Sequence, residues 1–127
     1  MARLGDIMNT TVYAAAPDTS VAEAAKSMVK GRFGSAVVTR SDVLIGIFTE
    51  RDVLRAAAAG TDLTTSPLSA WMTKDPETAD ADVDSEDAAH VMLSGGFRHL
   101  PVLDGNRVIG IVSLRDVLAT RIRRAAQ

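Results

Sequence analysis

Hydrophobic residues follow two different periods along the chain, and the order of these periods predicts the elements. After Ser20, apolar residues recur every three or four positions as far as Gly31, which predicts a helix. Two nearly continuous apolar runs then predict buried strands joined by a turn at Ser41 and Asp42. A helix closes the unit, and a short extended lead-in near Val12 precedes it. The expected elements span residues 21–31, 35–39, 44–48 and 50–59.

The same pattern returns 64 positions later without a gap, as shown by Met8 and Met72 and by the matching runs 51–54 and 115–118. An Asp-Gly pair at Asp104 is a strong hairpin signal in this second copy. Its lead-in lies near Thr78, and its elements are expected at residues 85–94, 99–103, 108–112 and 114–124. We therefore predict an α+β fold with two repeats, residues 1–60 and 61–127. The repeats are expected to pack as a pseudo-two-fold pair, because a core of about 60 residues alone is marginal.

Composition narrows the class of protein. Of 127 residues, 46% are hydrophobic and 24% charged, and the net charge of −2 argues against a general nucleic-acid binder. Cysteine is absent, which excludes thiolate metal sites and cysteine nucleophiles. No apolar run is long enough to cross a membrane, and the first residues do not resemble a secretory signal. We expect a cytoplasmic protein.

One motif stands at the end of the second strand in both repeats. A glycine, Gly46 or Gly110, is followed by two apolar residues, a hydroxyl residue, two more residues and then an aspartate. Thr49 with Asp52, and Ser113 with Asp116, resemble a helix capping box with Asp in place of Glu. The same geometry suits a ligand, because free N–H groups bind anions and a carboxylate accepts both hydroxyls of a ribose. The glycine would let such a ligand approach the backbone.

With these residues the repeat resembles the cystathionine-β-synthase (CBS) domain family, whose members occur as tandem pairs called Bateman modules. The resemblance covers residues 4–121. It rests on a lead-in Met, an Ala-x-x-x-Met helix, a strand with Val-Val or Pro-Val, and the Gly…Thr/Ser…Asp signature. The residues are Met8, Ala24, Met28, Val37-Val38, Gly46, Thr49 and Asp52, then Met72, Ala88, Met92, Pro101-Val102, Gly110, Ser113 and Asp116.

The resemblance implies two clefts between the repeats that bind adenosine nucleotides: AMP, ADP or ATP, with S-adenosylmethionine as a further candidate. The aspartate of one repeat would hold the ribose, and the hydroxyl residue would lie near ribose and phosphate. One site would use Ser113, Asp116, Thr11, Val12, Gly34 and Ser35. The other would use Thr49, Asp52, Thr78, His99 and Leu100.

Basic residues near these positions have two interpretations each. Arg98 and His99 either begin a strand with solvated heads or contact phosphate, and the resemblance favours phosphate. Arg51 and Arg115 each precede the aspartate and either pair with it or reach phosphate. Trp71 is expected to pack at a repeat or subunit junction rather than to stack on a ligand.

No metal site is expected, because the Asp-rich run at residues 80–84 lacks the glycine and glutamate of a calcium loop. The resulting hypothesis is a non-catalytic sensor that binds an adenine nucleotide and signals occupancy to an effector protein. The resemblance also implies a homodimer, a disc of four repeats that covers the alanine-rich face at residues 56–59. The alternatives are an interaction module with empty clefts, a nucleic-acid-linked regulator using the C-terminal arginines and, last, an enzyme.

Overall fold

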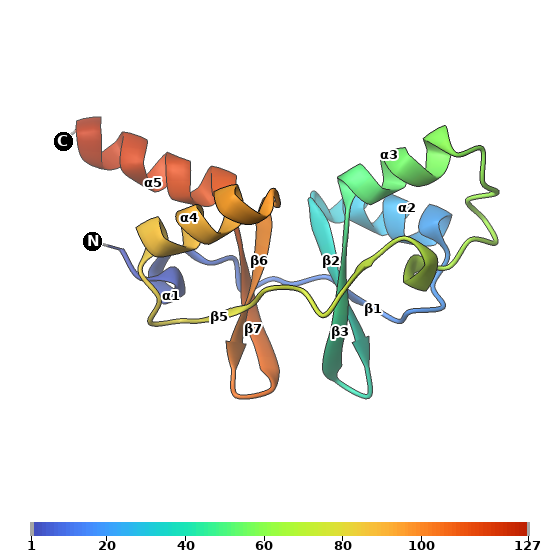
Figure 1. Ribbon diagram of the computed structural model, residues 1–127, viewed down its shortest axis with the longest axis horizontal. Coiled ribbons are helices and arrows are strands. Elements are labelled where there is room, and N and C mark those ends of the chain that lie inside the picture. Colours follow the sequence, from blue (N-terminus) through green and yellow to red (C-terminus); the bar gives the residue numbers. More distant parts are fainter. Residues whose placement is uncertain (1, 127) are drawn as a thin grey trace. The chain divides into compact units, whose positions relative to one another are not determined.

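The computed structural model describes residues 2–126, which form two compact units (Figure 1). One unit contains residues 13–76, and the other joins residues 2–12 to residues 77–126. The units and the sequence repeats are thus different divisions of the chain. The first lead-in packs with the second repeat, whereas the segment that follows the first repeat, residues 61–76, remains with it.

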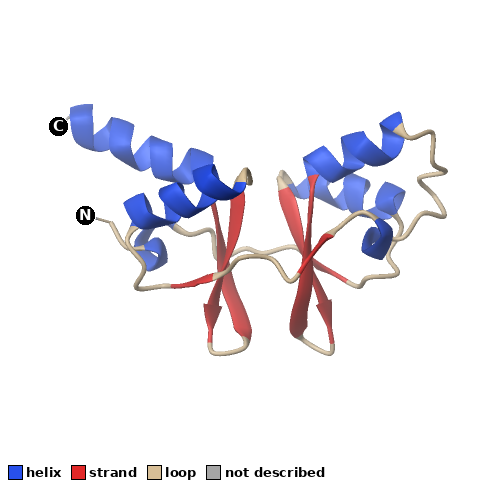
Figure 2. Cartoon of the chain, viewed as in Figure 1, coloured by secondary structure: helices blue, strands red, loops and turns tan. Residues whose placement is uncertain are grey.

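The unit of residues 13–76 is a four-stranded sheet covered by helices. Its strands are ordered β1-β2-β3-β4, and β1 is parallel to β2 while the other pairs are antiparallel. The helices α2 and α3 pack against β2 and β3, and the β2–β3 hairpin extends away from them (Figure 2). The elements are β1 (Ala14–Ala15), α2 (Val21–Gly31), β2 (Ser35–Arg40), β3 (Val43–Thr49), α3 (Glu50–Ala58), the 3₁₀ helix η1 (Leu68–Ala70) and β4 (Thr73–Lys74).

The other unit repeats this arrangement with a three-stranded sheet, ordered β5-β6-β7. A single antiparallel bridge between Asn9 and Ile111 stands where β4 stands in the first unit. Its elements are α1 (Leu4–Ile7), β5 (Ala79–Asp80), α4 (Ser85–Gly95), β6 (His99–Asp104), β7 (Arg107–Ser113) and α5 (Leu114–Ala126). The α+β class and the two helix–strand–strand–helix repeats are confirmed.

Each unit has its own core, and each core takes a fully buried leucine from the segment outside its repeat. Leu4 packs with Met92 and Val117 in the unit that contains the second repeat. Leu68 packs with Phe48 in the other. Leu4 and Leu68 therefore hold residues 2–12 and 61–76 in their units, because burying a leucine stabilises by roughly 1.5–3 kcal/mol.

The two signature glycines are buried beneath the lead-in methionines. A side chain built on Gly110 would place its Cβ 2.5 Å from the Met8 sulfur and 3.2 Å from the Asn9 carbonyl oxygen. On Gly46 the same atom would lie 2.5 Å from the Met72 sulfur. The space at each glycine is therefore filled by the protein itself. On that side of each strand, packing against methionine takes the space in which a ligand was expected to approach.

Side-chain caps fix where the helices start. The Ser20 hydroxyl accepts from the Glu23 N–H at 3.1 Å, and the Asp84 carboxylate accepts from the Glu86 N–H at 2.8 Å. The Asp-rich run therefore ends at the N-cap of α4. Between α3 and η1, the Thr64 hydroxyl and backbone N–H lower the pKa of Asp62, so this turn is favoured once Asp62 is ionised.

Candidate functional site

The start of α3 is closed by a capping box, as predicted. The Asp52 Oδ2 accepts from the Thr49 backbone N–H at 3.0 Å and from the Thr49 hydroxyl at 3.3 Å. The other carboxylate oxygen of Asp52 accepts from the guanidinium of Arg55 at 2.9 Å. Asp52 is buried, with 5% of its surface exposed. Its carboxylate is therefore committed to this chain's own donors on both oxygens.

The start of α5 has the same box with a different surrounding. The Asp116 Oδ2 accepts from the Ser113 backbone N–H at 2.9 Å, and the Ser113 hydroxyl accepts from the Asp116 N–H at 3.0 Å. Asp116 is half-buried, and no arginine or lysine whose side chain the structure describes forms an ion pair with it. Since a carboxylate has about four acceptor positions, Asp116 keeps capacity to accept further hydrogen bonds.

The structure brings several of the predicted residues together within single units. Ser35 lies opposite Thr49 in the β2–β3 pair, and the Glu50 N–H donates to the Gly34 carbonyl at 3.2 Å. His99 lies opposite Ser113 in the β6–β7 pair.

The remaining predicted positions differ in burial. Thr11 and Val12 belong to the same unit as Ser113, and Thr78 is exposed while Leu100 is in the core. The two complete groupings that the resemblance implies draw residues from both units and stay predictions.

The basic residues occupy different positions from those expected for pairing. Arg51, Arg98 and Arg115 are exposed. The cation that pairs with Asp52 is Arg55, which contradicts the first of the two interpretations of Arg51. The reason is helical spacing: residues three apart share a face, whereas the residue adjacent to Asp52 points elsewhere.

Sequence reasoning also missed a chain of contacts that continues from Arg55. The guanidinium carbon lies 5.6 Å from the centroid of the Trp71 ring, a cation–π contact. The Trp71 indole N–H donates to the hydroxyl of buried Ser66 at 2.9 Å. Trp71 thus packs against the core of its own unit and also holds Arg55, while its expected place at a repeat or subunit junction stays a prediction. The sequence did contain a signal for these contacts. Arg55, Trp71 and Ser66 occur in only one copy of the repeat, and the positions that match them are Ala119, Ile7 and Ala2.

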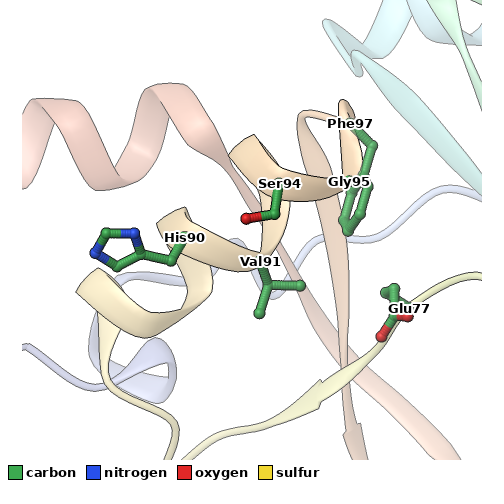
Figure 3. Close-up of a pocket in the computed structure, with 6 residues that line it drawn as sticks. All are labelled: Glu77, His90, Val91, Ser94, Gly95 and Phe97. Carbon is green, nitrogen blue, oxygen red and sulfur yellow. The ribbon is translucent and has the colours of Figure 1, made fainter.

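A hollow of about 470 Å³ lies outside all of these residues, along the outer side of α4 (Figure 3). It is lined by Glu77, His90, Val91, Ser94, Gly95 and Phe97. The wall contains one carboxylate and no lysine or arginine, so it does not suit the phosphates of a nucleotide. His90 is exposed there.

Residues 2–126 show neither a metal-binding cluster nor a membrane-spanning helix. Within them, no group of three or more Asp, Glu or His side chains could hold a metal ion. None of the helices described there is long and apolar enough to span a membrane.

Comparison with protein-family models gives one match, to the CBS domain, over residues 4–59 and again over residues 68–122. Among curated proteins, the CBS domain-containing protein YhcV of Bacillus subtilis is 33% identical over 123 residues, which cover 96% of this chain and 87% of YhcV.

Solved structures give the same family. The CBS-domain containing protein ATU1752 of Agrobacterium tumefaciens superposes with a TM-score of 0.87 at 32% identity, covering 94% of this chain and 99% of that one. The CBS domain pair of protein MJ0100, solved in complex with 5′-methylthioadenosine and S-adenosylmethionine, has a TM-score of 0.87 at 26% identity. The superposition covers 100% of this chain and 99% of the MJ0100 chain. Stand-alone CBS domain proteins are generally regulatory modules. The chain belongs to the CBS domain family and carries two CBS domains in tandem.

Proposed function

We propose that this protein is a non-catalytic regulatory module that binds an adenosine-containing ligand and passes its occupancy to a partner protein. The observation that carries the proposal is the carboxylate of Asp116 at the start of α5. It is oriented by the Ser113 N–H at 2.9 Å and keeps acceptor capacity for the hydroxyls of a ribose. The Ser113 hydroxyl accepts from the helix, so its own hydrogen is available to a ligand.

The class of ligand follows from two lines of support. The N-terminus of a helix of 13 residues attracts negative charge, which suits a phosphate or carboxylate on the ligand. The similar MJ0100 pair is described with 5′-methylthioadenosine and S-adenosylmethionine, so an adenosine group is the shared chemistry. We propose AMP, ADP, ATP and S-adenosylmethionine as the candidates.

Thermal unfolding in the presence of each candidate tests this function. A ligand at a hundred times its Kd stabilises by about 2.7 kcal/mol, so Tm should rise by several degrees in wild type. Because Asp116→Ala removes the ribose acceptor, the rise should disappear in that variant. Guanine nucleotides serve as the control and should give no shift. A flat response in protein freed of copurified nucleotide would favour the interaction module instead.

We propose that the chain forms a homodimer. Large apolar side chains are exposed on helices of both units, including Val29 at 81%, Leu54 at 68% and Ile122 at 69%. The alanine-rich face is a weaker reason than expected, because Ala56 is buried in the core of its own unit. Covering the larger residues would remove them from water.

We therefore expect a dimer of about 27 kDa from a chain of 13.4 kDa in light scattering at micromolar concentration. Leu54→Glu should shift the population to monomer, whereas Lys30→Glu, an exposed charge change on α2, should not. A monomeric wild type under these conditions would contradict the proposal.

A further inference from the structure

The two repeats carry the same aspartate signature with unequal surroundings. Asp52 is bound by an arginine that a tryptophan holds in place, and Asp116 has no such partner among the side chains that the structure describes. The residues that differ are Arg55, Trp71 and Ser66, whose counterparts 64 positions away are Ala119, Ile7 and Ala2. The second repeat therefore lacks the residues that surround the carboxylate of the first.

Hydrogen bonds from Thr49 and Arg55 use most of the acceptor positions of the Asp52 carboxylate. Oδ2 already accepts twice from Thr49, and Oδ1 accepts from Arg55. A ribose needs two acceptor positions on a carboxylate for its neighbouring hydroxyls. The side chain of Asp52 is only 7% exposed, so neither oxygen can turn outward while Arg55 remains.

Arg55 is held from two directions. Its guanidinium donates to Asp52 at 2.9 Å and lies over the Trp71 ring at 5.6 Å, while the Trp71 N–H bond to Ser66 fixes the ring. The Arg55 side chain is nevertheless 56% exposed, so it has room to leave toward solvent. The hydroxyl of Thr49 also donates to the Asp52 carboxylate, and no such bond joins the hydroxyl of Ser113 to the Asp116 carboxylate among the hydrogen bonds described.

We propose that Arg55 is an internal occupant of the first-repeat site, so that the chain binds one adenosine ligand at Asp116 and a second only after Arg55 leaves Asp52. This inference rests on the proposed function and adds a regulation to it. If Arg55 is displaced in about one molecule in a hundred, the apparent Kd at Asp52 is about a hundredfold weaker than the intrinsic one. The second site would then respond only to high ligand concentration.

Isothermal titration calorimetry with ATP, AMP and S-adenosylmethionine, each in a separate titration, tests the proposal through stoichiometry. Wild type is expected to bind one ligand per chain, with a second site at least about a hundredfold weaker. Arg55→Met keeps the apolar stem over Trp71 and removes the charge, so two sites within about tenfold of each other are expected. Adding Asp52→Asn to Arg55→Met should return the count to one.

Two further variants separate the effect of the Arg55 charge from a general effect of removing an exposed arginine. Arg55→Lys retains the positive charge without the planar fork that stacks on Trp71, so it should fold like wild type and show a second site of intermediate Kd. Arg121→Met is the matched control, because Arg121 is 59% exposed and paired with Glu86 at 3.3 Å. It should leave one site. Circular dichroism and Trp71 fluorescence report whether each variant is folded.

The outcomes separate this inference from the proposed function. Two equal sites in wild type, or one site in folded Arg55→Met and Arg55→Lys, would overturn the role of Arg55 and leave adenosine binding intact. Weaker binding at the wild-type site in Arg55→Met would also overturn it, since Arg55 would then contact the ligand. No binding of any of the three probes by any variant would overturn the proposed function and this inference together.

Discussion

Leu4→Ala is expected to lower the free energy of unfolding of the unit that contains the second repeat by about 2–5 kcal/mol. Leu4 lies 88 positions before Met92 and 113 positions before Val117, yet it is fully buried against both. Removing three carbons there leaves a cavity that α1, with only four residues, is too short to close. Hydrogen exchange measured by mass spectrometry should show faster exchange in residues 85–117 and little change in residues 21–58.

Leu68→Ala is the matched control for this experiment. Leu68 is also fully buried and also outside the helices and strands of the repeat it stabilises, but it packs with Phe48. Faster exchange should therefore appear in residues 21–58 instead. Leu93→Ala, at a side chain 66% exposed, should change stability by less than about 0.5 kcal/mol. If Leu4→Ala loosened residues 21–58, the division of the chain into these units would be wrong.

The elements of each repeat were predictable because their signals are local and occur twice. The apolar run at residues 35–39 corresponds to β2 at Ser35–Arg40, and the helix expected at residues 50–59 is α3 at Glu50–Ala58. A capping box at Thr49 was also readable, since its two partners are three residues apart. Local spacing encodes these features, and the second copy confirms each of them.

The placement of residues 2–12 and 61–76, each in the unit of the other repeat, was not predictable from the same signals. The elements involved are too short for a hydrophobic period, with four residues in α1 and two in β4. Their placement depends on packing with residues far along the chain, as Leu4 does with Met92. The contact of Arg55 with Trp71 was missed for a related reason. Matching the repeats selects residues they share, whereas this contact uses residues found in only one of them.

Gly46→Val is expected to destabilise the unit of residues 13–76 by about 3 kcal/mol, near the upper end for overpacked sites. The first added carbon would stand 2.5 Å from the Met72 sulfur and 3.0 Å from the Thr73 carbonyl oxygen. The methionine can rotate, but the carbonyl belongs to the paired strand β4 and moves only if the β3–β4 bridge shifts. Urea unfolding followed by Trp71 fluorescence measures the change, because this tryptophan lies in the same unit.

A double-mutant cycle with Met72→Ala distinguishes packing from ligand access as the role of Gly46. If the glycine makes room for the methionine, shortening Met72 gives the valine space, and the double variant should be more stable than additivity predicts by about 0.5–3 kcal/mol. Gly110→Val with Met8→Ala should behave alike, because Met8 contacts Gly110 in the same way. If instead stability were unchanged while binding at Asp116 was lost in Gly110→Val, the glycine would serve the ligand. Both repeats have a methionine and a glycine at matching positions. Ligand binding, rather than the packing of methionine against glycine, would then explain why both repeats have them.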